Sequence, residues 1–123
     1  MVPRIVFDFD GVIHSYRSGW KGETVIPDPP VPGIREVIEQ LMERGYDVVI
    51  VSARAKTAEG TLAICHWLQF HGLPMLSVMS EKPPALVYVD DRAICFDGDT
   101  SSLYEKIVNF KPWYVKESDN ENH

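Results

Sequence analysis

Two aspartates near the start of the chain, Asp8 and Asp10, are the residues best placed to do chemistry. They follow a short apolar, β-branched run over residues 4–7, which predicts a buried strand. In a strand, residues i and i+2 point to the same side, so both carboxylates should face one small volume. Carboxylates so close repel each other unless a cation lies between them, and Mg²⁺ prefers oxygen ligands. The plainer alternative is that both residues only end the strand and cap a turn, which Gly11 then completes.

Two further carboxylates, a hydroxyl and an ammonium group follow or precede other predicted strands. The run over residues 46–51 is almost continuously apolar and ends in Ser52, and the run over 85–89 ends in Asp90-Asp91. Lys82 precedes that last strand. Ligands of open α/β sheets bind beyond the carboxyl ends of the strands. We therefore expect these side chains to meet Asp8 and Asp10 at one edge of the sheet.

The pattern of elements predicts how that edge is built. Apolar periodicity predicts helices over 33–44, 58–71 and 101–109, and further strands over 75–79 and 93–96. Strands that alternate with helices are typical of a parallel α/β sheet, here a three-layer, Rossmann-like, open and mainly parallel sheet. We expect one domain over residues 1–115, with a short flap at about 13–27 and a disordered tail over 116–123.

Composition is that of a soluble globular domain. The chain has 123 residues, 45% hydrophobic and 24% charged, and a net charge of −6. Because nonspecific nucleic-acid binding requires a cationic surface, this charge argues against it. No apolar run approaches the roughly 20 residues of a membrane helix. Cys65 and Cys95 lie among apolar neighbours, so two reduced, buried thiols are expected. These points favour the cytoplasm and no membrane partner.

The ordered set Asp8-Phe9-Asp10-Gly11-Val12, Ser52, Lys82 and Asp90-Asp91 resembles the four motifs of the haloacid dehalogenase-like (HAD) hydrolase superfamily. The resemblance covers most of the chain, from about residue 4 to residue 96. It implies that Asp8 is the nucleophile that forms an aspartyl-phosphate. It implies that Asp10 is the general acid and base and also a Mg²⁺ ligand through its backbone carbonyl.

The resemblance also implies roles for the later motifs. Ser52 would bind the phosphoryl oxygens, and Lys82 would neutralise negative charge, although Lys56 competes for that position. Asp91 is the first choice as a direct metal ligand, with Asp90 next to it. An aspartate at position 10 followed by Val12 resembles the phosphatase form of the first motif, not the dehalogenase form.

No insertion large enough for a cap domain is visible, so a capless protein is expected. An open site suits a bulky phosphorylated substrate such as a polynucleotide end. Substrate contacts are assigned to Gly11, Arg17, Trp20 and Arg54. The protein would be a monomer or a homodimer.

Three alternatives stay open at this point. The chain could be a catalytically silent HAD-like module that binds phosphate or a partner. It could be a small-molecule nucleotide or sugar phosphatase closed by a second subunit. A receiver-type signalling domain is disfavoured, because its phosphorylated aspartate ends a middle strand, whereas the strand over 46–51 ends in Ser52.

Overall fold

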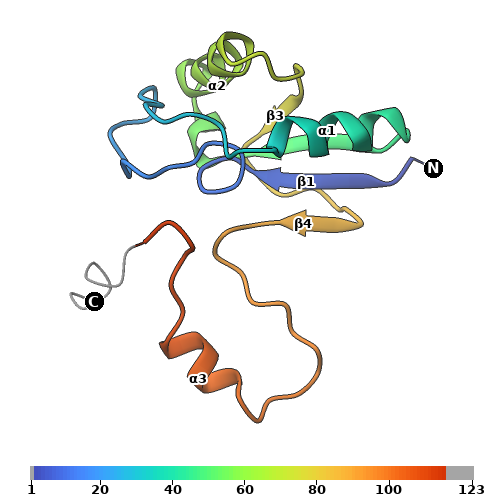
Figure 1. The fold of residues 1–123 in the computed structure, drawn as a ribbon, viewed down its shortest axis with the longest axis vertical. Helices are drawn as coiled ribbons and strands as arrows, with labels where there is room; N and C mark the ends of the chain where they lie inside the picture. The colour runs from blue at the N-terminus through green and yellow to red at the C-terminus, as the bar shows by residue number, and fades with distance from the viewer. Residues whose placement is uncertain (1, 116–123) are drawn as a thin grey trace.

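A computed structural model describes residues 2–115 (Figure 1), so the predicted disordered tail, 116–123, lies outside the described residues. The elements in chain order are β1 (Arg4–Asp8), α1 (Ile34–Glu43), β2 (Asp47–Val51), the 3₁₀ helix η1 (Ala53–Lys56), α2 (Ala58–Phe70), β3 (Ser77–Met79), β4 (Val87–Val89) and α3 (Leu103–Val108). Within this part of the chain, no helix has the length and apolar character that crossing a membrane requires.

The sheet places the ends of three strands side by side. Its order is β3-β2-β1-β4 and every pair is parallel. Asp8 is in register with Val51 and Phe7 with Val89, so the residues that follow β2 and β4 emerge close to the end of β1. The predicted Rossmann-like open sheet without a cap domain is confirmed.

The two faces of the sheet are covered differently. Connections that move in one direction along a parallel sheet lie on one face, so α1 and α2 both cover the same face, as Figure 1 shows. There the alternate residues Ile5 and Phe7 of β1 pack with Ile38 of α1 and Leu68 of α2 in the main core. On the other face, a valine cluster of β1 and β2 is covered by Met79 and Ala85, at the two ends of the β3–β4 connection. A coil therefore takes the place of a helix in the third layer.

The strand predicted over 93–96 is wrong. These residues are irregular and belong to an excursion, residues 92–112, which Figure 1 shows reaching away from the sheet with α3 at its tip. An open cavity of about 420 Å³ in this excursion is lined by Arg92, Ile94, Phe96, Leu103, Ile107 and Phe110. The apolar run therefore pairs with no strand, and among its residues only Ile94 is partly buried. The expected burial of Cys95 is also wrong because its side chain is exposed, while Cys65 is partly buried and both thiols are free.

Candidate active site

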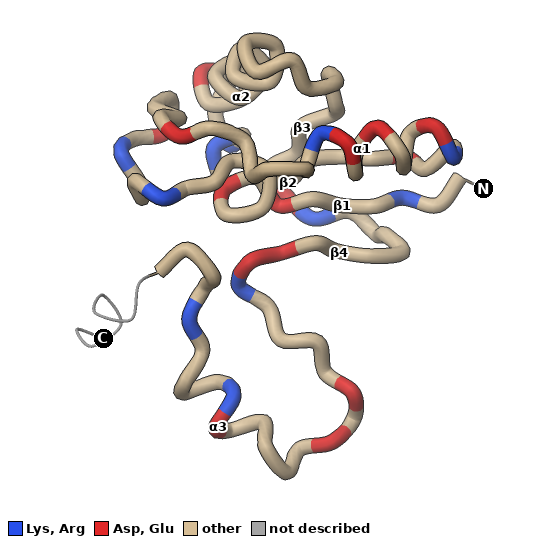
Figure 2. Tube along the Cα trace, viewed as in Figure 1, with Lys and Arg blue, Asp and Glu red and all other residues tan. Residues whose placement is uncertain are grey.

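Three acidic side chains meet at the carboxyl edge of the sheet. Asp8, Asp90 and Asp91 each offer an oxygen, and these oxygens lie within 4.8 Å of one another. Asp8 is the last residue of β1, and the other two follow β4 directly. Figure 2 shows acidic residues gathered where these two strands end. The geometry brings together three of the four carboxylates that were expected to meet here, and the Asp10 side chain is not part of this cluster.

The closeness of these three acidic side chains favours the protonated form of Asp8. Burial, a hydrogen bond with Asp91 and the charges of Asp91 and Asp90 raise the pKa of Asp8 from 3.8 to about 8. The Asp91 side chain is only 2% exposed, and its Oδ1 atom is buried without a hydrogen-bond partner. A buried acceptor without a donor costs free energy, so this oxygen is a natural contact for a cation.

Asp90 differs from Asp91 because both of its oxygens have donors. The Lys82 ammonium lies 2.8 Å from Asp90 Oδ2, and the Arg92 backbone N–H donates to Oδ1 at 2.9 Å. The hydrogen bond to Asp90 raises the pKa of Lys82. Burial works to raise the pKa of Asp90, but the Lys82 and Arg92 hydrogen bonds bring it below its usual value. Lys56 is exposed at the end of η1 and forms no ion pair within the described residues.

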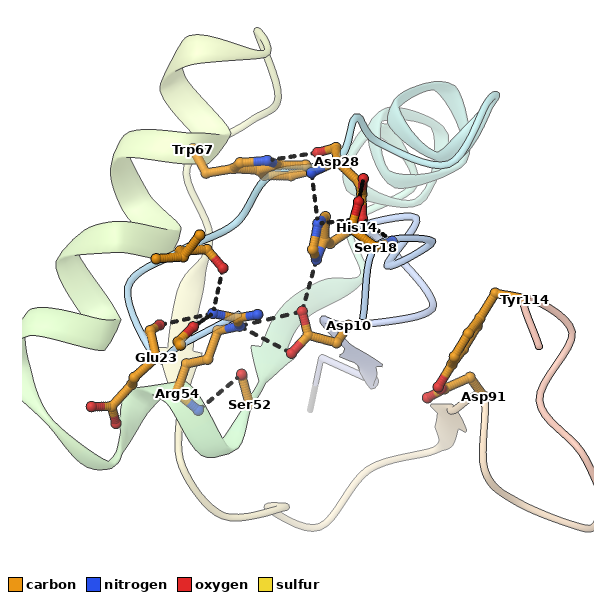
Figure 3. A network of polar contacts seen from close by, with 12 residues as sticks. Asp10, His14, Ser18, Glu23, Asp28, Ser52, Arg54, Trp67, Asp91 and Tyr114 are labelled. Carbon is orange, nitrogen blue, oxygen red and sulfur yellow. Dashed lines mark hydrogen bonds and ion pairs between the residues drawn. The ribbon is translucent and has the colours of Figure 1, made fainter. Parts of the chain in front are cut away.

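Asp10 points away from the triad and is held by two donors (Figure 3). His14 Nδ1 lies 2.8 Å from Asp10 Oδ1, and Arg54 Nε lies 3.0 Å from Oδ2. The backbone N–H of Asp28 donates to His14 Nε2 at 3.1 Å. Because Nε2 accepts that bond, the neutral ring carries its proton on Nδ1. Asp10 therefore accepts from both side chains, which fixes the orientation of its carboxylate.

Arg54 holds the flap, residues 13–27, next to Asp10 through hydrogen bonds to the flap backbone. Its side chain is fully buried, and Nη1 donates to the backbone carbonyls of Gly22, Glu23 and Val25 at 2.8, 2.8 and 3.2 Å. The ring of Trp20 lies over the guanidinium, 4.5 Å from its centroid. Two predicted substrate contacts, Arg54 and Trp20, therefore contact each other. Arg54 has no surface on the cavity, and Trp20 covers it from outside.

A cavity of about 290 Å³ opens between these groups. It is lined by Asp8, Asp10, Tyr16, Ser52, Ala53, Asp91, Arg92 and Tyr114. Ser52 follows β2, and its hydroxyl accepts from the backbone N–H of Arg54 at 3.1 Å, which begins η1. Four of the predicted site residues thus line one cavity. Lys82 and Asp90 do not line it, and they are paired with each other.

Two aromatic residues near the end of the described chain close one side of this cavity, and sequence reasoning missed their role. The Tyr114 hydroxyl donates to Asp91 Oδ2 at 2.7 Å, and Trp113 Nε1 donates to the carbonyl of Gly11 at 2.6 Å. The Tyr114 ring meets that of Tyr16 edge to face at 5.3 Å. The only signal in the sequence is an aromatic pair directly before a polar tail.

Gly11 is where the strand-end loop and this aromatic pair meet. Its φ is +86°, which favours glycine. A Cβ at this position would collide with the Asp91 carboxylate and come 2.7 Å from a ring carbon of Tyr114. The guanidinium of exposed Arg17, another predicted substrate contact, instead lies over the Trp113 ring, 5.4 Å from its centroid.

Comparison with known proteins supports the fold. No protein-family model matches the chain, and no curated protein matches it significantly. Among solved structures, a conserved protein from Bacteroides thetaiotaomicron is similar, with 23% sequence identity and a TM-score of 0.58. The match covers 88% of this chain and 91% of that chain. At this identity the likeness shows a shared fold.

Proposed function

We propose that this protein is a Mg²⁺-dependent phosphomonoesterase of the HAD type, with Asp8 as the nucleophile. The observation that carries the proposal is the buried, partnerless Oδ1 of Asp91 beside Asp8. In the metal-free protein the proton on Asp8, whose pKa is raised to about 8, relieves the repulsion between the two carboxylates, and a bound divalent cation would do so in its place. A chance group of surface acids would instead keep its oxygens in water.

The donor set fits Mg²⁺ because it consists of oxygens alone. Asp8 and Asp91 would hold the ion, and Asp90 would stay next to it, since both Asp90 oxygens already accept other bonds. The Asp10 side chain is committed to His14 and Arg54, so Asp10 would contribute only its backbone carbonyl. When bound, the ion would supply positive charge to the phosphoryl oxygens and to the Asp8 carboxylate.

The residues around the cavity then divide the reaction between them. Asp10 can act as the acid only when it enters the reaction protonated, which requires it to give up its ion pair with Arg54. An Asp8 oxygen then attacks phosphorus, the bond from phosphorus to the leaving oxygen breaks, and Asp10 gives that oxygen its proton. Asp10 next takes a proton from water, whose oxygen attacks the phosphorus and releases phosphate from Asp8. The Ser52 hydroxyl, which lines the same cavity, binds a phosphoryl oxygen. Lys82 offsets the negative charge from the Asp90 side.

The size of the cavity bears on the substrate. The cavity volume of about 290 Å³ lies just below the usual range of ligand sites, about 300–1,000 Å³. It holds a phosphoryl group and the first atoms of the alcohol, and anything larger lies outside the cavity. This agrees with a phosphorylated polynucleotide end. The second candidate, a small-molecule phosphatase, is favoured by Tyr16 and Tyr114, which line the cavity and contact each other edge to face.

Hydrolysis of an aryl phosphate with and without Mg²⁺ tests the reaction. We expect metal-dependent turnover that is lost in Asp8→Asn and Asp10→Asn. The matched control is Asp97→Asn, an exposed aspartate of the excursion that should leave turnover unchanged. Wild-type turnover in Asp8→Asn, or full turnover in EDTA, would rule out the proposal.

A substrate panel then separates the two candidate substrate classes. It compares oligonucleotides phosphorylated at the 3′ or 5′ end with mononucleotides and sugar phosphates. A strong preference for oligonucleotide ends supports the open-site proposal. A preference for a free sugar phosphate or nucleotide supports the small-molecule alternative. Tight phosphate binding without turnover of any compound would instead indicate the silent binding module.

A further inference from the structure

The C-terminal aromatic pair, Trp113 and Tyr114, is attached to the acidic triad by specific hydrogen bonds. Tyr114 lies 23 residues beyond Asp91, and its hydroxyl donates to Asp91 Oδ2 at 2.7 Å. The same hydroxyl lies 3.4 Å from both Nε and Nη2 of Arg92, which donate to it. The phenol therefore receives hydrogen bonds from a cation and passes one on to a carboxylate.

This contact decides which oxygen of Asp91 is left free. With Oδ2 taken by the phenol, the partnerless buried oxygen is Oδ1. Because the side chain is 98% buried, given its 2% exposure, water does not substitute for a missing donor. Rotation of the carboxylate would break the Tyr114 bond, so the phenol holds the free oxygen in one orientation.

Packing around the phenol makes that orientation rigid. The Tyr114 ring lies where a side chain on Gly11 would be, and the ring also contacts that of Tyr16 edge to face at 5.3 Å. Trp113 anchors the preceding residue through its hydrogen bond to the Gly11 carbonyl at 2.6 Å. Figure 3 shows Tyr114 lying against Asp91, across the cavity from Asp10.

We propose that Tyr114 is a positioning residue that presents Asp91 Oδ1 to the divalent cation. Groups that hydrogen-bond to metal ligands orient them, and removing such a group typically weakens metal binding 10- to 100-fold. The proposal rests on the metal site of the proposed function. It adds that a segment beyond the four sequence motifs completes the site, in a protein that has no cap domain.

The test is calorimetric titration of the protein with Mg²⁺ in the absence of substrate. Tyr114→Phe removes the hydroxyl and keeps the ring, and it should weaken Mg²⁺ binding at least about tenfold. The matched control is Tyr104→Phe, because Tyr104 on α3 is 76% exposed and its loss of a hydroxyl should change nothing. Asp91→Asn, which removes the ligand charge, gives the reference for a lost metal ligand.

The outcomes separate the two proposals. Mg²⁺ binding by Tyr114→Phe within twofold of wild type, with loss of binding in Asp91→Asn, would overturn the role of Tyr114 and leave the metal site standing. No Mg²⁺ binding by wild-type protein would overturn the metal site itself. A purely structural role would lower the thermal stability of Tyr114→Phe in EDTA but leave the dissociation constant of the folded protein unchanged. If Tyr114→Phe does not fold, Trp113→Phe, which frees the same segment from Gly11, should also weaken binding, and unchanged binding there would overturn the inference.

Discussion

Replacing Asp8 by asparagine should stabilise the metal-free protein. Burial and the nearby carboxylates raise the pKa of Asp8 from 3.8 to about 8, so the folded carboxyl resists ionisation that the unfolded chain undergoes freely. At pH 7 this difference corresponds to about 4 kcal/mol of lost stability. Because Asp8 is only partly buried, water screens the effect, and we expect Asp8→Asn to gain about 2 to 3 kcal/mol.

The dependence on pH follows from the sign of the shift. The folded state keeps the Asp8 proton up to about pH 8, and the unfolded state releases it near 3.8. Between these values the folded state binds more protons, so the free energy of unfolding falls as pH rises. In Asp8→Asn this contribution is absent. The gain over wild type should therefore be small at pH 5 and grow toward pH 8.

Urea unfolding in EDTA at pH 5, 7 and 8 measures this difference. Glu43→Gln, an exposed substitution at the end of α1, is the control for the loss of one negative charge. Added Mg²⁺ should reverse the order of stability, because only the wild type gains from binding the ion. A destabilised Asp8→Asn at pH 8, or a pH dependence equal to that of wild type, would refute the electrostatic reasoning.

Three further predictions concern the same site. Mg²⁺ binding must displace the Asp8 proton, so the apparent affinity measured by calorimetry should rise about tenfold per pH unit below pH 8 and level off above it. His14→Phe keeps the ring packing but removes the donor to Asp10 and the acceptor for a backbone N–H. The free energy of unfolding, measured by thermal unfolding, should fall by about 2 to 4 kcal/mol. A decrease under about 1 kcal/mol would contradict this prediction. Lys82→Gln should lower phosphatase turnover about 100-fold or more, with little change in stability because Lys82 is half exposed. Lys56→Gln should have no such effect, and the reverse result would make Lys56 the catalytic lysine.

Much of the sheet edge could be predicted because its signals are local. Apolar runs gave β1, β2 and β4, and the rule that parallel strands end at one edge brought Asp8 and Asp91 together. Register explains why this worked, since Phe7 pairs with Val89 and the next residues of both strands are aspartates. The chemical roles of these residues stay predictions.

The supporting contacts could not be predicted because they join distant parts of the sequence. Arg54 lies 44 residues from Asp10, and Trp113 lies 102 residues from Gly11. Only the four-residue spacing of Asp10 and His14 is local. An arginine after a strand reads equally well as a substrate contact and as a buried clamp, and only the position of the flap separates the two. The apolar run over 93–96 failed as a strand because hydrophobicity does not specify which surface a residue packs against.

The position of β1 inside the sheet has a consequence for how the protein is made. β1 is synthesised first, yet its two neighbours are β2 and β4, and the phenol that holds Asp91 comes later still. While the chain leaves the ribosome, both edges of β1 stay unpaired until β2 and β4 have been synthesised. Unpaired strand edges make incompletely folded chains prone to aggregate. A translation intermediate that ends before residue 114 lacks the hydroxyl that binds Asp91. The candidate site would therefore be complete only after residue 114 has been synthesised.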